Sequence, residues 1–213
     1  MPLTSDIEID CSRKNPARCL RGARLRKADR PKVDPFSVHD AETFIAALHR
    51  DWGEAQGNYD EFRFFTGMRP SEQIALVLSE LDLVNGIVSV NKSRVFGVDR
   101  CMTRTAEDRR VQLCPRALQV LNRQLRFRER LAAAGKVNHD HVFVLDSGEA
   151  IQDLRVVGTR WRKTLRSLKV RYRRPYTARH SSVSWNLMAA KNLFWVAQQH
   201  GHSTMTMLRT YAK

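Results

Sequence analysis

The C-terminal stretch Tyr176-Thr177-Ala178-Arg179-His180, followed by Gly201-His202 and then Tyr211, decides how the rest of the chain is interpreted. A second stretch lies far upstream, at Thr66-Gly67-Met68-Arg69-Pro70-Ser71-Glu72. Together they supply two guanidinium groups, an imidazole and a phenol. Arginine is always charged and presents a fork of donors that matches phosphate oxygens, and a phenol becomes a nucleophile when it loses its proton. This set of groups suits the attack of a phenolate on a phosphodiester.

The charge of the chain indicates a polyanionic partner. Its 213 residues include 37 Lys and Arg against 22 Asp and Glu, a formal net charge of +15. Such a balance favours nucleic acid first and an anionic membrane surface second. No apolar run approaches the roughly 18 residues of a membrane-spanning helix, and the first ten residues lack the order of a signal peptide. We therefore expect a cytoplasmic protein that is not embedded in a membrane.

The four cysteines are scattered, without the spacing of a metal site or a disulfide framework. We expect reduced structural thiols, and neither a metal nor a cofactor. They are Cys11, Cys19, Cys101 and Cys114.

The periodicity of apolar residues predicts a mostly α fold with one small antiparallel three-stranded β-sheet, an α+β class. Ser37 is expected to cap the first helix, with Asp40 at the capping-box position. Asn85-Gly86 predicts a hairpin between strands 81–84 and 87–90, and 109–113 is the expected third strand. The remaining helices are expected over 58–66, from 69, from 115, and over 154–168, 176–188, 193–200 and 203–211.

The apolar residues of these segments predict which faces are buried. The first three helices are expected to bury Phe44, Ile45, Leu48, Phe62, Phe65, Ile74, Leu76 and Val77. The helix from Pro115 is expected to bury Leu118, Leu121 and Leu125, and the helix over 154–168 to bury Val157, Trp161, Leu165 and Leu168.

Two regions of unequal size are expected. Residues 1–35 form a basic run with little apolar periodicity, which reads as a linker or the frayed end of something removed, and its charge favours contact with a phosphate backbone. Residues 36–213 carry the motifs and the predicted helices and strands.

The motifs resemble those of the catalytic domain of the tyrosine recombinase (phage integrase) family, from about Pro35 to the end of the chain. Family members carry Thr-Gly-x-Arg-x-x-Glu, which matches Thr66 to Glu72 here. They carry His-x-x-Arg-His, which matches Tyr176 to His180, and Gly-His followed nine residues later by a nucleophilic tyrosine, which matches His202 and Tyr211. The order and spacing of the three motifs are highly specific.

The resemblance implies site-specific DNA recombination through a 3′-phosphotyrosine intermediate. It implies that residues 36–213 are the catalytic domain, truncated shortly after Tyr211, and that residues 1–35 are a basic linker or the remnant of a removed N-terminal DNA-clamping domain. It makes Tyr211 the nucleophile, Arg69 and Arg179 the phosphate clamp, and Tyr176 and His202 further hydrogen-bonding groups. Glu72 would orient the site. Lys92, Arg94, Arg173 and Arg174 are the cations expected to contact DNA.

Two positions depart from the family pattern. Tyr176 replaces the first histidine of His-x-x-Arg, and a phenol does not titrate readily near neutrality. The family places a catalytic lysine before the third strand, where this chain has Thr103-Arg104-Thr105. Arg104 keeps the charge but is a poor proton donor. Lys92 is the other candidate for the lysine role, although a contact with a backbone phosphate is the favoured interpretation of that residue.

Three hypotheses stay open at this point. The chain is an active integrase-type recombinase of a phage or other mobile genetic element, a catalytically impaired DNA-binding remnant of one, or an enzyme similar to type IB topoisomerases. The spacing from Gly201-His202 to Tyr211 favours the first over the third. The expected partner is double-stranded DNA with attachment-type sites. We expect a tetramer on DNA for a full-length protein and a monomer for this chain.

Overall fold

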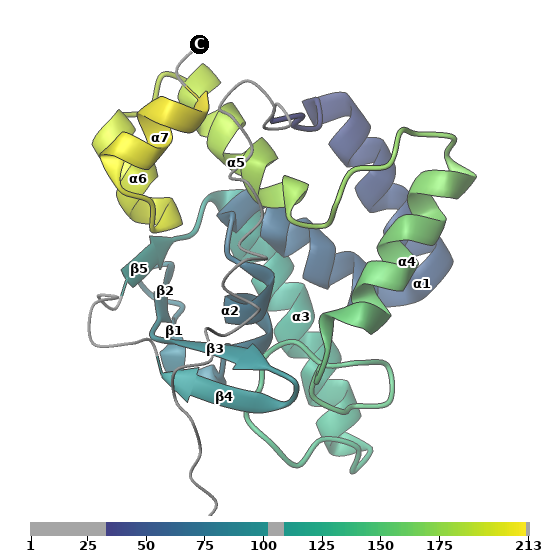
Figure 1. The fold of residues 1–213 in the computed structure, drawn as a ribbon. Coiled ribbons are helices and arrows are strands. Elements are labelled where there is room, and N and C mark those ends of the chain that lie inside the picture. Colours follow the sequence, from purple (N-terminus) through teal and green to yellow (C-terminus); the bar gives the residue numbers. More distant parts are fainter. Residues whose placement is uncertain (1–32, 102–108, 212–213) are drawn as a thin grey trace, which may run out of the picture. The chain divides into compact units, whose positions relative to one another are not determined.

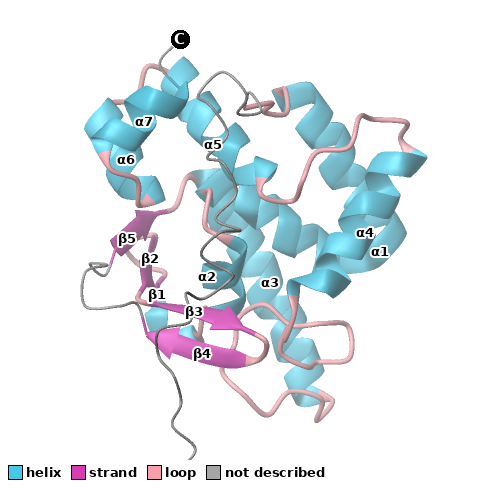
Figure 2. Cartoon of the chain, viewed as in Figure 1, coloured by secondary structure: helices cyan, strands magenta, loops and turns pink. Residues whose placement is uncertain are grey.

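A computed structural model describes residues 33–101 and 109–211. The basic run at 1–32 and Arg104 therefore lie outside the described residues. Val33 to Lys213 forms one compact unit. Within it, two small sheets lie beside a larger group of helices (Figures 1 and 2).

The first helix begins and ends where the sequence predicts. Helix α1 spans Val38–Thr66, the Ser37 hydroxyl accepts a 3.0 Å hydrogen bond from the Asp40 amide, and Gly67 closes the helix. Gly53 interrupts it with φ 73° and ψ −167°, so that two helical segments meet there. The predicted second start at Asn58 is wrong, because the helix resumes directly after Gly53 and buries residues such as Ala55 and Gln56.

The short helix after Gly67 carries the upstream motif. Helix α2 spans Pro70–Ala75 with Arg69 as its N-cap, and a 3₁₀ turn follows at Leu78–Glu80. Pro70 suits the first turn because the amide it lacks would have no partner there. Ile74 is buried as predicted, which fixes this helix to the core below the sheet.

The predicted three-stranded sheet is confirmed. Strands β1 (Leu81–Asp82), β2 (Ile87–Val90) and β5 (Arg109–Gln112) pair antiparallel in the order β1-β2-β5. In the register, Leu81 lies opposite Val88, and Val88 lies opposite Val111. Val88 and Val111 are both buried, which gives the sheet its core face.

A second sheet was not predicted from the sequence. Strands β3 (Lys92–Val95) and β4 (Val98–Cys101) form a two-stranded antiparallel sheet (Figure 2). Phe96 and Gly97 turn the chain with φ of 49° and 76°, and a phenylalanine rarely adopts that left-handed conformation. All four residues of β4 are exposed, so no alternation of apolar side chains signals a strand.

The remaining helices agree closely with the sequence. Their bounds are Pro115–Ala133 (α3), Leu154–Ser167 (α4), Thr177–Met188 (α5), Leu193–His200 (α6) and Thr204–Tyr211 (α7). The buried face of α3 differs from the prediction, since Leu121 is buried but Leu118 and Leu125 are half-buried. The fully buried positions are instead Ala117, Val120, Leu121, Gln124 and Phe127.

Helix α1 lies at the centre of the helical part and contacts α3, α4 and α5. An aromatic cluster joins these helices, in which Trp161 of α4 packs against Phe44 and Phe64 of α1. A separate small core joins α5, α6 and α7 through Val183, Val196 and Met207 (Figure 1). The fold therefore brings the end of α1, the start of α2 and the three C-terminal helices to one place.

Candidate functional site

Arg69 is held at the junction between α1 and α2. Its amide donates to Glu72 Oε2 at 2.8 Å, while its guanidinium donates to Glu72 Oε1 at 2.7 Å and to the Gly201 carbonyl at 3.0 Å. The turn before it requires Gly67, whose φ is 62° and whose missing Cβ would lie 2.4 Å from the His200 ring. The side chain stays 37% exposed, so that Arg69 is fixed but still open to a ligand.

Glu72 is the buried anion of this site. Arg109 of β5 donates to both of its oxygens, at 2.8 and 2.6 Å, and Arg69 shares Oε1. Burial by itself raises the pKa of Glu72, but Arg109 and then Arg69 outweigh it and lower the pKa from 4.5 to about 2. Glu72 is therefore ionised at neutral pH and holds two guanidinium groups in place.

Arg179 brings a third guanidinium group to the same region from inside the protein. It is buried at the start of α5 and donates to the carbonyls of Gly67, at 2.7 Å, and His200. Burial lowers its pKa to about 10, and the charges of Arg69 and Arg109 add to that effect. It stays charged at neutral pH. Two guanidinium groups thus pair with Glu72 and a third, Arg179, bonds to backbone carbonyls nearby, which leaves a net positive site.

His202 follows the end of α6 and is half-buried. Its Nδ1 lies 3.1 Å from Met207 Sδ, and because a thioether only accepts, Nδ1 carries the proton. Burial and the charge of Arg179 lower the pKa of His202 to about 3. The neutral ring therefore presents Nε2 as an acceptor, and donation from Nε2 to an anion requires the protonated ring or the other tautomer.

Tyr211 and Tyr176 lie on either side of His180. The Tyr211 hydroxyl of α7 is 2.6 Å from His180 Nδ1, and the Tyr176 ring packs edge-on against His180 with centroids 5.3 Å apart. Burial raises the pKa of Tyr211, and the positive charge of Arg179 partly offsets that rise. No role was predicted for His180 from the sequence. Its i,i+4 spacing from Tyr176 could have indicated one, because residues at that spacing lie on the same face of a helix.

The structure thus brings together Arg69, Glu72, Arg179 and His202, with Tyr211 and Tyr176 next to Arg179. Arg179 interacts electrostatically with both tyrosines, and its charge opposes the rise that burial causes in the pKa of Tyr211. Arg109 was expected only as part of a strand. Its partner Glu72 lies 37 positions away along the chain, and no local pattern indicates such a pairing.

The four cations predicted to contact DNA differ in exposure. Lys92 is paired with Glu80 at 2.9 Å. Arg94 is only 8% exposed, and it bonds to Asp99, Gln152 and the Gly97 carbonyl. Arg173 packs over Phe36 and is paired with Asp34 at 3.0 Å. Arg174 is the exposed member of the set.

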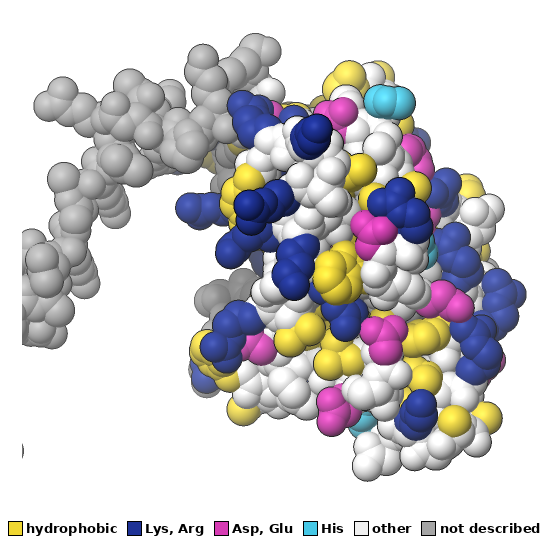
Figure 3. All heavy atoms as spheres, turned by 90° about the vertical axis from the view of Figure 1, so that its right-hand side faces the viewer, with side chains coloured by type: hydrophobic (Ala, Val, Ile, Leu, Met, Phe, Trp, Pro, Cys, Tyr) yellow, Lys and Arg dark blue, Asp and Glu magenta, His cyan; other side chains and the backbone are white. Residues whose placement is uncertain are grey.

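Exposed cations of another element were missed. On α4, Arg155, Arg162, Lys163 and Arg166 are exposed. Lys and Arg side chains predominate over acidic ones on the face that α1 and α4 occupy (Figure 3). This face adds to the positive potential that the sequence predicts.

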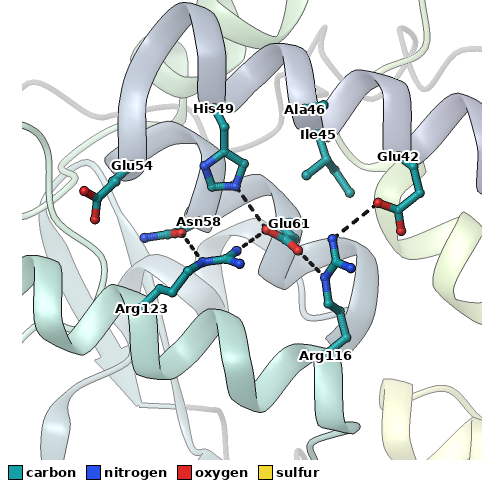
Figure 4. Close-up of a pocket in the computed structure, with 9 residues that line it drawn as sticks. All are labelled: Glu42, Ile45, Ala46, His49, Glu54, Asn58, Glu61, Arg116 and Arg123. Carbon is teal, nitrogen blue, oxygen red and sulfur yellow. Dashed lines mark hydrogen bonds and ion pairs between the residues drawn. The ribbon is translucent and has the colours of Figure 1, made fainter.

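A second buried glutamate, Glu61 of α1, has several basic side chains around it. It lies in a hollow of about 310 Å³ between α1 and α3 (Figure 4). His49 lies 3.0 Å from its carboxylate, and Arg116 and Arg123 of α3 both pair with it. Burial raises the pKa of Glu61, but His49, Arg116 and Arg123 outweigh that effect and lower it to about 2. Other carboxylates, Glu42 and Glu54, also line this hollow.

Neither a metal centre nor a membrane span is found in the described part of the chain. No group of three or more His, Cys, Asp or Glu side chains there is arranged to hold a metal ion. No helix within residues 33–101 and 109–211 combines the length and apolar character needed to cross a bilayer.

Comparison with known proteins identifies the family. Residues 38–213 match the model of the Phage integrase family. The chain is 27% identical to prophage integrase IntR of Escherichia coli (strain K12), covering 89% of this chain and 49% of that protein. It is 26% identical to tyrosine recombinase XerC of Thermodesulfovibrio yellowstonii, covering 92% of this chain and 62% of that protein.

Solved structures confirm the fold. The integrase of transposon Tn1549, in complex with a circular intermediate DNA, superposes with a TM-score of 0.75 at 15% identity, covering 87% of this chain and 63% of that one. The present chain spans about half the length of prophage integrase IntR. It has the mostly helical fold with a small antiparallel sheet that the sequence predicted, and it belongs to the phage integrase family.

Proposed function

We propose that this chain is the catalytic domain of a site-specific DNA recombinase that cuts and rejoins DNA through a 3′-phosphotyrosine intermediate. The observation that carries the proposal is the concentration of Arg69, Arg109 and Arg179 around the single carboxylate Glu72, beside Tyr211. A net positive site with fixed donors stabilises the charge that develops on a phosphodiester under attack. The DNA complex of the related Tn1549 integrase supports DNA as the substrate.

In the proposed reaction, Tyr211 attacks the scissile phosphate and the 5′-oxygen leaves as a hydroxyl. Arg69 and Arg179 bind the non-bridging oxygens, and Glu72 holds Arg69 in position. Tyr176 donates a further hydrogen bond. His202 donates from Nε2 when the neighbouring phosphate anion favours the protonated ring. The new phosphotyrosine bond keeps the energy of the broken bond for religation, so no high-energy cofactor is required.

Arg104 is proposed at the position of the leaving-group acid. Its replacement of the family lysine predicts slow expulsion of the 5′-oxygen, because a guanidinium group retains its proton below about pH 12. The pairing of Lys92 with Glu80 supports a structural role for Lys92 and so favours Arg104 for this position.

The wider context of the protein is also proposed. Residues 1–35 connect the domain at 36–213 to DNA-clamping parts of a longer protein, and Arg174 contributes to the DNA-binding surface. The substrate is double-stranded DNA with attachment-type sites, bound by a tetramer of the full-length protein in the bacterial cytoplasm. Helix α7, which follows α6, provides the nucleophile Tyr211.

One experiment separates the hypotheses. The chain is incubated with a supercoiled plasmid and with a suicide duplex nicked near the scissile phosphate, from which the short fragment that carries the new 5′-hydroxyl diffuses away. A recombinase accumulates a covalent adduct at a 3′-phosphate, and Tyr211→Phe forms none. Binding without any adduct indicates the impaired remnant and contradicts the proposal. Processive relaxation of the plasmid by single chains indicates a topoisomerase-like enzyme.

A further inference from the structure

The Tyr211 hydroxyl has a partner that could accept its proton. A phenol is protonated at neutral pH, and burial raises the pKa of Tyr211 further, so the nucleophile needs a base. Among the described residues, the one hydrogen bond of this hydroxyl is the 2.6 Å contact with His180 Nδ1. That length lies within the range of general-base geometry.

The other candidates for the base are occupied or unsuited. His200 is fully buried, and both of its ring nitrogens are engaged, with the Val196 carbonyl at 2.9 Å and Ser182 Oγ at 3.1 Å. His202 has a free Nε2, but the hydrogen bond of the Tyr211 hydroxyl in the described part of the chain goes to His180 and not to His202. Tyr176 brings a phenol, which does not accept a proton readily near neutrality. His180 is the remaining imidazole next to the nucleophile.

We propose that His180 is the general base that activates Tyr211, one helical turn after the position where the family pattern has a histidine and this chain has Tyr176. The inference rests on the proposed function. As Tyr211 Oη bonds to phosphorus, its proton moves to His180 Nδ1. The bond between phosphorus and the 5′-oxygen breaks, and that oxygen takes a proton from a donor, which is solvent water in the simplest case. On religation His180 returns its proton to the departing phenolate.

The surroundings of His180 suit this role. Tyr176 packs against one side of the ring and fixes its orientation, while α7 brings Tyr211 to Nδ1. Burial and the charge of Arg179 lower the pKa of His180, so the ring is unprotonated at neutral pH. The charged and titratable groups facing it are Arg179 and Tyr176 of α5, His202 after α6, and Tyr211 of α7.

The test uses His180→Asn, because the Asn side-chain oxygen keeps an acceptor near the position of Nδ1 but takes up no proton. Adduct formation on the suicide duplex should slow about 10²-fold at neutral pH. In the parent chain the rate should be level around neutrality and fall in acid as His180 is protonated. In the variant the rate should rise steadily with pH instead, because free phenolate is then required. Exposed His39, changed to Asn, is the matched control and should leave the profile unchanged.

A second measurement separates proton transfer from positioning. Replacing Tyr211 with a fluorinated tyrosine of lower phenol pKa should restore much of the rate lost in His180→Asn and change the parent chain far less. An unchanged pH profile in His180→Asn, or loss of rate that the fluorinated tyrosine does not restore, would overturn the role of His180. Absence of any adduct from the parent chain would instead refute the proposed function itself. Thermal unfolding of each variant confirms that it is folded during the assay.

Discussion

Two buried glutamates of this protein, Glu61 and Glu72, have nearly the same immediate surroundings. Each accepts from two arginines, and each has its pKa lowered to about 2. Arg116 and Arg123 at Glu61 are 41% and 38% exposed and Arg69 at Glu72 is 37% exposed, whereas Arg109 is only 9% exposed. A paired, buried carboxylate is therefore not by itself a mark of the functional site.

The next layer of charge distinguishes them. The hollow at Glu61 contains two further carboxylates, Glu42 and Glu54, and an arginine there is already shared between Glu61 and Glu42. The site at Glu72 has a third guanidinium group, Arg179, with no carboxylate of its own among the described residues. At Glu61 the acidic and basic charges balance, because Arg130 pairs with Glu54, whereas the site at Glu72 keeps a net positive charge that attracts a phosphate. The charges beyond the first ion pairs, rather than the buried carboxylate, therefore distinguish the site that binds an anion.

The largest effect is expected when an arginine is removed from the site at Glu72, and the matched control removes an arginine from the cluster at Glu61. Arg179→Ala should reduce covalent adduct formation by about 10³-fold, because a fixed donor to the transition state is lost. Arg123→Ala removes one partner of Glu61 and should leave the rate within about twofold when measured well below its unfolding temperature. The measurement is the single-turnover rate on the suicide duplex. Equal losses in both variants would show that the two clusters do not differ in function.

Substitution of the glutamates themselves should affect stability at both sites. Glu61→Gln and Glu72→Gln each remove a buried carboxylate and leave its two arginines without their anion, and each should lower the free energy of unfolding by about 3 kcal/mol. Urea unfolding followed by circular dichroism measures this loss. In conditions where both variants stay folded, only Glu72→Gln should slow adduct formation, because Arg69 loses the partner that orients it. A slow Glu61→Gln variant would contradict the division of roles.

The pH dependence of stability should come from both carboxylates alike. Each has a pKa of about 2 in the folded protein against 4.5 for an unperturbed glutamate, so each stabilises the fold above about pH 4.5. That contribution is lost as the pH falls from 4.5 toward 2, because the unfolded chain then binds more protons. The loss is of order 2 to 3 kcal/mol for each group. Urea unfolding between pH 2 and 6 should show a shallower fall in Glu61→Gln than in the parent chain.

The smallest effect is expected at a third pair, Lys92 with Glu80. Lys92→Ala should lower the free energy of unfolding by less than about 1 kcal/mol and leave adduct formation unchanged, because this lysine is bound to the carboxylate of Glu80.

Arg104→Lys should instead speed cleavage of an ordinary phosphodiester, since lysine gives up a proton near pH 10.4. The gain should vanish with a 5′-bridging sulfur, because a thiolate leaves without a proton.

One pair of results would show that Lys92, and not Arg104, is the leaving-group acid. If Lys92→Ala slows the oxygen substrate but not the sulfur substrate, and Arg104→Lys gives no gain, then Lys92 is the acid. Arg104 would then be a phosphate contact, and the alignment of the segment before β5 with the family lysine would be wrong.

Much of the fold could be predicted from the sequence because the relevant signals act within a few residues. Ser37 caps α1, Gly67 and Gly201 end helices in the left-handed conformation, and Asn85-Gly86 turns the first hairpin. The β3–β4 sheet escaped prediction because its turn begins at Phe96 and its outer strand is exposed throughout. A turn without a typical turn residue and a strand without alternating apolar residues leave no pattern in the sequence that would predict them.

The sequence by itself determined the identity of the motif residues, their order and the positive charge of the chain. The tertiary structure alone decided which charges meet, since Glu61 pairs with Arg123 across 62 positions and Glu72 with Arg109 across 37. It also placed His180 against Tyr211, 31 positions further along the chain. Helix caps and periodicity depend on neighbours within about one turn, whereas these pairings depend on how α1, α3 and the C-terminal helices pack. The physical reason is that the energy of a charged pair depends on distance and burial in space, which the order of residues does not specify.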